Sequence, residues 1–265
     1  MTARVGVEGT VAPAVVPRAR MRGIRKSFGS IEALRGVDLD LWPGEVLGLV
    51  GDNAAGKSTL TKILAGAYAP DAGAIELDGG AVRFASPAEA RAQRIEMVYQ
   101  DLSLCDTVDV AGNLFLGREP TRRVLGLRLL DKARMLADAR RTLDSLDIHV
   151  PNMRALVAQL SGGQRQSIAI GRAAAFEPRV LIMDEPTSAL AVAEVEAVLR
   201  LIRRVRDGGV SVILITHRLQ DLFRVCDRIA VMYEGLKVAE RRTDETDLED
   251  LVRLIVGEKP RREAA

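Results

Sequence analysis

The hydrophobic residues of this chain gather in short unbroken runs, with longer mixed segments between them. The runs at 45–50, 180–183 and 210–216 are apolar almost throughout, which is typical of parallel strands buried on both faces of a sheet. The segment 131–146 differs, because its apolar residues recur at helical spacing and form one face of an amphipathic helix. Strands that alternate with helices along a chain predict an α/β fold built on a mainly parallel sheet.

Two regions are predicted to branch from this sheet. Short strand candidates within 21–85 are separated by turn residues at 42–44 and 77–80, and they predict an antiparallel β lobe. The segment 103–165 is richer in helix formers and contains the amphipathic helix, so we expect an α-helical lobe there. Mixed acidic and basic residues on that helix favour the core of the lobe over a membrane surface.

Two local patterns predict where elements begin and turn. The segment 86–89 (Ser-Pro-Ala-Glu) is a capping box with proline at the first helical position, so a short helix should start there. The segment 228–240 reads as a strand, a Glu-Gly turn at 234–235 and a second strand.

The segment 51–59 (Gly-Asp-Asn-Ala-Ala-Gly-Lys-Ser-Thr) carries the strongest chemical signal in the chain. It matches the P-loop pattern, in which a glycine-rich turn connects a buried strand to a helix. Such a turn aims backbone N–H groups and a helix N-terminus at one point, where a phosphate binds. Lys57 would add a positive charge for the β- and γ-phosphates, and the Ser58 hydroxyl would ligate Mg²⁺. An ordinary glycine-containing turn has no need of the strand before it and the helix after it.

A second helix start, at 161–164 (Ser-Gly-Gly-Gln), also points to an anion. Ser161 and Gln164 form a capping box, yet each glycine between them weakens a helix by about 1 kcal/mol relative to alanine. A plain capped helix gains nothing from these glycines. A bare helix N-terminus that must approach an anion closely does need them.

Polar side chains follow several predicted strands. Because ligands bind beyond the carboxyl ends of parallel strands, Asp184 is predicted to lie beside the P-loop and hold Mg²⁺, and Glu185 to orient or deprotonate an attacking water. His217 would donate to the γ-phosphate, and Gln100 would offer a neutral oxygen to Mg²⁺ or water. The alternatives are solvated carboxylates and a structural histidine; the P-loop in the same chain favours the functional interpretation.

Five motifs follow one another along the chain: the P-loop, the glutamine after a strand, Leu-Ser-Gly-Gly-Gln at 160–164, the Asp-Glu strand end and the histidine after the next strand. In this order they resemble the nucleotide-binding subunit of an ATP-binding-cassette (ABC) transporter. The resemblance implies one ATPase domain at 21–258. It implies a P-loop NTPase (RecA-like) parallel-sheet core, with an antiparallel β lobe and an inserted α-helical lobe at about 103–165. ATP and Mg²⁺ are implied with it.

The resemblance implies a role for each motif residue. Phe28 would stack on adenine, although the residue pattern alone leaves a core position open. Glu185 would be the catalytic base and His217 the γ-phosphate switch. Ser161 and Gly163 would reach the γ-phosphate bound on an opposite subunit. The nucleotide site is implied to contain Gly51, Asp52, Asn53, Ala54, Ala55, Gly56, Lys57, Ser58 and Thr59, and the Mg²⁺ site Ser58, Gln100 and Asp184.

Longer phrases at 97–104, 113–119 and 190–196 resemble bacterial simple-sugar importers of the ribose and fructose type. A single P-loop and no internal repeat make the chain closer to the single-cassette, fructose-type subunit. The resemblance implies a second, identical ATP-binding subunit and a polytopic membrane permease, which Gln100 would link to the catalytic site. It also implies an extracytoplasmic sugar-binding protein, and a peripheral location on the cytoplasmic face of the inner membrane.

Two positions depart from the family pattern. Ala54 stands where this family most often has glycine, and a left-handed backbone there would cost alanine on the order of 1–2 kcal/mol. Ala191 stands where many cassettes have an aspartate that couples the two sites of the dimer. Its absence bears on that coupling and not on the ATPase assignment.

Composition agrees with such a subunit. Lys and Arg total 38 against 36 Asp and Glu, so no strong field favours nucleic acid, and aromatics at 3% argue against a single-strand binding platform. No apolar run approaches the roughly 20 residues that span a bilayer. Cys105 and Cys226 match no metal spacing and are expected to be free thiols. The ends, 1–20 and 259–265, are expected to be flexible tails.

The alternative function is a cassette ATPase that acts on a ribosome or DNA. Such proteins usually carry tandem cassettes, long coiled coils or zinc clusters, and the sequence contains none of these features. A regulatory module that binds nucleotide without turnover is disfavoured, because Glu185 and His217 are both present.

Overall fold

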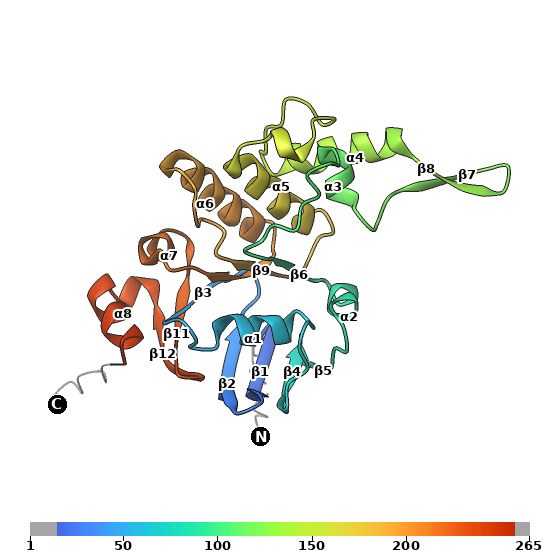
Figure 1. The fold of residues 1–265 in the computed structure, drawn as a ribbon. Coiled ribbons are helices and arrows are strands. Elements are labelled where there is room, and N and C mark those ends of the chain that lie inside the picture. The colour runs from blue at the N-terminus through green and yellow to red at the C-terminus, as the bar shows by residue number, and fades with distance from the viewer. Residues whose placement is uncertain (1–14, 258–265) are drawn as a thin grey trace, which may run out of the picture.

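A six-stranded sheet forms the centre of the molecule, in the order β12-β11-β3-β10-β9-β6 (Figure 1). All neighbours pair in parallel except β11 and β12, which are joined by the turn at Glu234 and Gly235. The mainly parallel sheet predicted from the apolar runs is therefore confirmed. Its strands are β3 (Val46–Gly51), β6 (Ile95–Val98), β9 (Val180–Asp184), β10 (Ser211–Ile215), β11 (Arg228–Tyr233) and β12 (Leu236–Arg242).

The computed structural model describes residues 15–257. The tail predicted at 259–265 lies outside the described residues, and so does most of the one predicted at 1–20. The boundary at 20 is placed too late, because Ala19 and Arg20 already belong to strand β1 (Ala19–Phe28).

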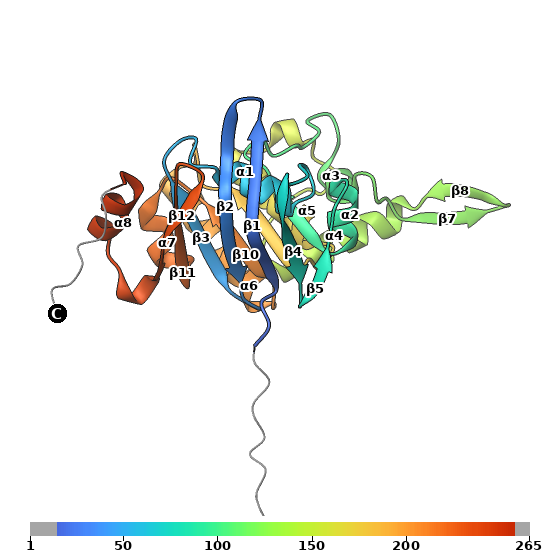
Figure 2. The same cartoon turned by 90° about the horizontal axis from the view of Figure 1, so that it is seen from below.

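A four-stranded antiparallel sheet covers one face of the central sheet (Figure 2). Its order is β2-β1-β4-β5, and the predicted turn residues lie where strands end: 42–44 leads from this sheet into β3, and Asp78 and Gly79 join β4 to β5. The predicted antiparallel lobe is confirmed. Its strands are β1 (Ala19–Phe28), β2 (Ile31–Leu41), β4 (Ala72–Leu77) and β5 (Gly80–Val82).

Helices and the antiparallel sheet bury both faces of the central sheet. Along β9, Leu181 and Met183 face one hydrophobic cluster, with α5 to α8, while Val180 and Ile182 face the other, with α1 and the antiparallel sheet. This alternation explains why the strand is apolar at every interior position. The helices outside the helical lobe are α1 (Lys57–Leu64), α2 (Pro87–Ala92), α5 (Gly162–Ala174), α6 (Val192–Asp207), α7 (Leu219–Val225) and α8 (Leu248–Ile255), with a 3₁₀ turn η2 (Thr243–Glu245).

The predicted α-helical lobe contains α3 (Val110–Phe115), α4 (Lys132–Ser145) and a 3₁₀ turn η1 (Val157–Gln159). The amphipathic helix is confirmed as α4, but its buried face is Met135, Ala139 and Leu143, so not every apolar residue of the predicted face is buried: Ala133 is exposed. Within residues 15–257, no helix combines the length and apolar character needed to cross a membrane.

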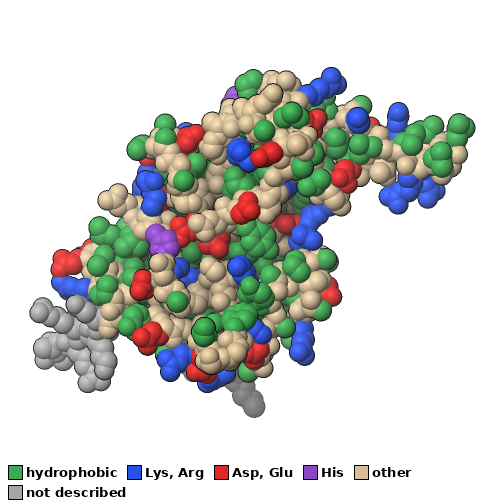
Figure 3. All heavy atoms as spheres, viewed as in Figure 1, with side chains coloured by type: hydrophobic (Ala, Val, Ile, Leu, Met, Phe, Trp, Pro, Cys, Tyr) green, Lys and Arg blue, Asp and Glu red, His purple; other side chains and the backbone are tan. Residues whose placement is uncertain are grey.

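A β-hairpin that the sequence reasoning missed extends from this lobe. Strands β7 (Thr121–Val124) and β8 (Leu127–Leu130) pair only with each other among the described strands, and all their residues are exposed. The hairpin projects away from the body in both ribbon views (Figures 1 and 2), and basic and apolar side chains cover it (Figure 3). At its neck the Asp131 N–H donates to the Pro120 carbonyl oxygen, at 2.8 Å.

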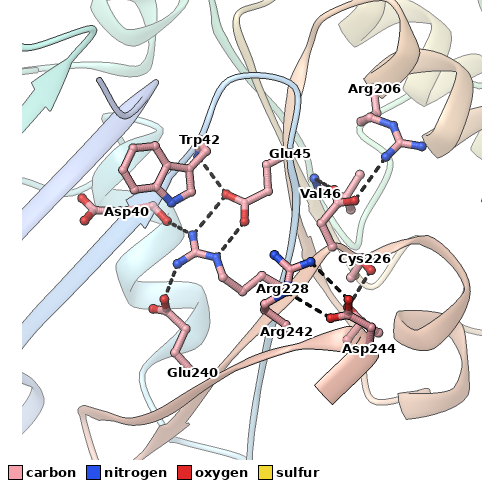
Figure 4. Close-up of polar contacts among 12 residues, drawn as sticks. Asp40, Trp42, Glu45, Val46, Arg206, Cys226, Arg228, Glu240, Arg242 and Asp244 are labelled. Carbon is pink, nitrogen blue, oxygen red and sulfur yellow. Dashed lines mark hydrogen bonds and ion pairs between the residues drawn. The ribbon is translucent and has the colours of Figure 1, made fainter. Parts of the chain in front are cut away.

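The two large sheets are tied together by Arg228 (Figure 4). Its guanidinium donates to Glu45 Oε1 at 2.7 Å and to the Asp40 carbonyl oxygen at 2.6 Å, and it pairs with Glu240. Glu45 also accepts from the Trp42 N–H at 2.8 Å. Arg228 and Glu45 are both largely buried, so the end of β2 and the starts of β3 and β11 are held by one desolvated network.

Candidate nucleotide site

The P-loop lies between the end of β3 and the start of α1, with its backbone tightly wrapped. Gly51 has a φ of +149° and Gly56 a φ of +96°. A Cβ on Gly51 would lie 2.1 Å from the Met232 carbonyl oxygen, and one on Gly56 would lie 2.6 Å from that of Ala33. Only glycine fits at both positions, and the turn can therefore present bare backbone to a phosphate.

The Lys57 ammonium folds back over this turn. Its Nζ donates to the carbonyl oxygens of Gly51 and Asp52, at 2.8 and 2.9 Å. The side chain is buried, and burial lowers the pKa of Lys57 while the nearby carboxylates, chiefly Glu185, oppose that shift. The charge is therefore held at the loop by neutral oxygens, which a phosphate can replace.

Ala54 adopts the left-handed backbone that makes alanine costly. Its φ is +65°, where a side chain costs on the order of 1–2 kcal/mol relative to glycine. The turn around it nevertheless closes, because the Ala55 N–H donates to the Asp52 carbonyl oxygen at 3.1 Å. The departure from the family pattern is thus absorbed as local strain.

Asp184 ends β9 and Glu185 follows it. Burial raises the pKa of Asp184, and Lys62, Lys57, His217 and a hydrogen bond from Ser58 oppose that shift. Burial also raises the pKa of Glu185, with the charge of Asp184 adding to the rise. A raised pKa makes Glu185 a better proton acceptor than a solvated carboxylate, as a general base requires.

His217 lies against Glu185, with Nε2 at 2.8 Å from Oε1. The Glu185 backbone has a φ of +55°, which is uncommon outside glycine and is found at sites that hold strain. It is fixed by an N–H donated to the Ile215 carbonyl oxygen at 2.9 Å and by the Ser188 hydroxyl, which donates to the Glu185 carbonyl at 2.9 Å. Strand β10 therefore positions both the backbone of Glu185 and the histidine that holds its side chain.

These groups share one cavity of about 450 Å³ beyond the carboxyl ends of β9 and β10, here called the nucleotide cavity. Gly51 and Asp52 are not among the residues that line it. The predicted site residues that do line it are Asn53, Ala54, Ala55, Gly56, Lys57, Ser58, Thr59, Gln100, Asp184, Glu185 and His217.

Phe28 stands at the end of β1, outside the residues that line the nucleotide cavity. Its core interpretation is wrong, because the residue is 43% exposed. Its ring packs edge-on against Tyr68, with centroids 5.3 Å apart, and under the Lys26 ammonium at 5.5 Å. Phe28 pairs across the hairpin with Ile31, which does line the cavity. A role in stacking on adenine stays a prediction.

The helix start at 161–164 has the predicted capping box. The Ser161 Oγ accepts from the Gln164 N–H at 3.2 Å, and the Gln164 side chain accepts from the Ser161 N–H at 3.0 Å. Ser161 and Gly163 line a different cavity, of about 360 Å³, together with residues of α6. The structure therefore does not bring these two residues into the nucleotide cavity of their own chain.

Sequence reasoning missed two acidic residues that contact predicted motifs or the loops beside them. Asp221 is buried in the first turn of α7, and its Oδ2 accepts from the Thr187 hydroxyl at 2.8 Å, which joins the loop after β9 to that helix. An acid in the first turn of a helix is too common a signal to have singled it out. Glu194 contacts Ser161 and Gly163. Its signal, an acid at the third position of α6, is weak because Ala191 at the N-cap hides the capping pattern.

A protein-family model described as ABC transporter matches residues 34–188, which run from β2 through the P-loop to the residues just after Glu185. The chain belongs to this family. As an ABC cassette it is an ATP-binding subunit that hydrolyses ATP. The fold and the family thus agree with the resemblance drawn from the motifs.

Several relatives of this ABC cassette are named as import ATP-binding proteins. It is 41% identical over 237 residues to the xylose/arabinose import ATP-binding protein XylG of Sulfolobus acidocaldarius, covering 89% of this chain and 93% of that protein. It is 44% identical over 253 residues to the fructose import ATP-binding protein FrcA of Rhizobium meliloti, covering 94% and 97%. The ribose import ATP-binding protein RbsA of Chromobacterium violaceum is 42% identical, but the chain spans only 49% of its length.

The cassette also resembles solved structures. The crystal structure of a nucleotide-free ATP-binding cassette from an ABC transporter superposes with a TM-score of 0.77 at 26% identity, covering 91% of this chain and 95% of that one. The P-loop NTPase core with its two lobes is therefore the shared architecture.

Proposed function

We propose that this chain is the ATP-hydrolysing subunit that powers import of a simple sugar through a separate membrane permease. The observation that carries the motor part is the nucleotide cavity, where Lys57, Asp184, Glu185 and His217 meet around the P-loop. The sugar part is supported by the printed names of the relatives, which are xylose/arabinose, ribose and fructose import proteins.

The chain's own groups would divide the work of hydrolysis. The backbone of the P-loop and Lys57 would hold the phosphates, while Glu185 would orient a water and accept its proton. His217, which touches Glu185 in this structure at 2.8 Å, would turn toward the γ-phosphate. Catalysis would then come mainly from positioning and electrostatics.

The donor set at this cavity fits Mg²⁺. Ser58, Gln100 and Asp184 all line it, and they offer a hydroxyl, an amide oxygen and a carboxylate. Oxygen donors of this kind suit a hard cation that shares its ligands with nucleotide phosphates. When bound, Mg²⁺ would neutralise part of the phosphate charge.

The dimer is proposed to be head-to-tail, between two copies of this chain. Ser161 and Gly163 line a different cavity and not the nucleotide cavity of their own chain, and an opposite subunit would bring its γ-phosphate to them. Loss of that phosphate on hydrolysis would weaken the dimer, and this difference in binding can do work on a permease.

The remaining partners are proposed from the same relatives. A polytopic permease would contact the cassette near Gln100, an extracytoplasmic sugar-binding protein would act through the permease, and the cassette would sit peripherally on the cytoplasmic face of the inner membrane. The near balance of 38 basic and 36 acidic side chains supports a role without nucleic acid. A ribosome- or DNA-directed ATPase is not favoured, because the relatives reported above are named as import proteins.

The test is ATP hydrolysis by the cassette in liposomes with its permease and binding protein, with xylose, arabinose, ribose or fructose added in turn. One sugar should stimulate hydrolysis. Glu185→Gln should bind ATP with unchanged affinity and lower kcat about 10²–10⁴-fold, because it removes the general base. If no sugar stimulated hydrolysis, the proposed sugar cargo would be rejected. If Glu185→Gln turned over at the parental rate, the assignment of Glu185 as the general base would be rejected.

A further inference from the structure

The N-terminus of α5 already holds an anion, and the anion is part of the same chain. The Glu194 Oε1 accepts from the Ser161 hydroxyl at 3.1 Å and from the Gly163 N–H at 3.0 Å. Its other oxygen, Oε2, accepts from the Ala191 N–H at 3.2 Å, at the start of α6. One carboxylate thus lies at the N-termini of two helices, where partial positive charge favours it.

Glu194 covers the donors that an opposite subunit would need. A Cβ on Gly163 would lie 2.7 Å from Cγ, Cδ and Oε1 of Glu194, so the glycine is what lets this side chain lie flat on the backbone. Gly163 is buried, although it stands in the first turn of a helix with an open end. The two groups expected to meet a γ-phosphate, the Ser161 hydroxyl and the Gly163 N–H, are the two that Glu194 Oε1 occupies.

We infer that Glu194 is an internal placeholder for the γ-phosphate, which its carboxylate must vacate before the nucleotide of an opposite subunit can bind at α5. The inference rests on the proposed ATP-bound dimer. A carboxylate and a phosphate oxygen compete for the same two donors, and two anions cannot share them without strong repulsion. Displacing Glu194 from these donors costs free energy. The ATP-bound dimer therefore binds less tightly than it would without this contact.

The surroundings give Glu194 somewhere to go. The cavity of about 360 Å³ beside it is lined by Ala193, Ala197 and Arg200 as well as by Ser161 and Gly163. A side-chain rotation would carry the carboxylate into this space, which Arg200 also lines. Glu194 is thus a positioning residue that acts on Ser161 and Gly163 and not on the reacting atoms.

The experiment compares Glu194→Ala, Glu194→Gln and a control, Glu196→Gln, each in a Glu185→Gln background so that ATP is not consumed. Glu196 lies two residues further along α6, on another side of the helix, and pairs with Arg224 instead. Dimerisation would be followed by sedimentation velocity as a function of protein concentration with saturating ATP. Binding of a fluorescent ATP analogue to the dilute monomer would be measured in parallel, since Glu194 does not line the nucleotide cavity.

Glu194→Ala should lower the dissociation constant of the ATP-bound dimer about tenfold, within the usual 5–150-fold range of coupling between sites. Glu194→Gln should fall between, because its amide keeps one acceptor oxygen but no charge. Glu196→Gln should match the background, and monomer affinity for the analogue should be equal in all variants.

Unchanged or weaker dimerisation in Glu194→Ala, with its melting temperature intact, would overturn the inference. If the melting temperature of Glu194→Ala falls, the test rests on Glu194→Gln. That variant keeps the helix contacts and must still dimerise more tightly than the background. If the analogue binds but no variant dimerises, the inference also fails, because no phosphate ever competes. Absence of analogue binding would instead reject the proposed function.

Discussion

At the scale of single residues, the nucleotide site holds backbone strain on both sides of the cavity. Ala54 on the P-loop and Glu185 after β9 both have positive φ, at +65° and +55°. Neither residue is glycine, so each conformation costs free energy that the surrounding hydrogen bonds must offset. The strained backbone at Ala54 positions no reactive side chain. At Glu185 it directs the carboxylate toward the cavity and His217.

Ala54→Gly should therefore stabilise the protein. Relief of the left-handed alanine gains about 1 kcal/mol, partly offset by the greater freedom of glycine in the unfolded chain. The matched control is Ala137→Gly at an exposed position within α4, which should lose about 0.5–1 kcal/mol. Urea denaturation of both variants decides the matter, and a loss of stability in Ala54→Gly would mean that the loop does not carry this strain.

Glu185→Gln should stabilise the fold at neutral pH. Burial raises the pKa of Glu185, so its ionised form is less favourable in the folded than in the unfolded chain. That penalty is complete above the raised folded pKa and disappears as the pH falls below the unfolded value of about 4.3. Melting temperatures from pH 8 to pH 4 should show a gain that shrinks on acidification.

Glu196→Gln provides the opposite sign in the same experiment. Its hydrogen bond with Arg224 lowers the pKa of Glu196, so the ionised side chain stabilises the fold above the ordinary pKa and the substitution should lower the melting temperature at neutral pH. That loss should shrink as the pH falls toward 4, because it disappears only below the lowered pKa. If the melting temperatures of the two variants changed in the same direction with pH, burial would not be what determines the pKa of Glu185.

At the scale of elements, the sequence predicted what hydrophobic burial and capping determine. Buried runs became β9 and β10, and the predicted N-caps Ser86 and Ser161 begin α2 and α5, with a reciprocal capping box at Ser161. The β7–β8 hairpin escaped prediction for a physical reason. Both of its faces are exposed, so no alternation of buried and exposed positions marks it, and its turn at Leu125 and Gly126 lies inside a lobe defined by helix formers.

Replacing residues 122–129 with Gly-Gly should leave the fold and its basal ATPase intact. The strand residues are all exposed, and Thr121 and Leu130 already pair across the hairpin, so two glycines can close it as a tight turn. The melting temperature should change by less than about 2 °C, since the deleted side chains are exposed and little buried apolar area is lost. A larger drop, or loss of hydrolysis by the isolated subunit, would show that the hairpin supports the lobe.

At the scale of the whole molecule, motif order predicted which strand ends would meet but not what joins the parts. Asp184, Glu185 and His217 converge because parallel strands bring their carboxyl ends to one edge. Contacts between distant segments, such as Glu194 with Gly163 or Arg228 with Glu45, leave no periodic trace in the sequence. They depend on how helices and sheets pack, which only the folded chain specifies.

Arg228 should be among the most costly single substitutions in the chain. Arg228→Met leaves the buried Glu45 carboxylate without its cation, which costs about 3–5 kcal/mol. Adding Glu45→Gln should recover part of that loss, because the unpaired charge is gone. Urea denaturation of the single and double variants measures both effects; a double variant no more stable than Arg228→Met would show that packing, and not charge, dominates this junction.

The closed neck of the hairpin has a consequence for the gene. The hydrogen bond from the Asp131 N–H to the Pro120 carbonyl oxygen joins the two ends of the hairpin whatever lies between them. Codons between these two positions can therefore be gained or lost without disturbing the lobe. A short epitope or a fluorogenic peptide placed between Leu125 and Gly126 should be displayed clear of the body. The cassette therefore offers a natural handle for tagging, at a point that leaves both of its termini untouched.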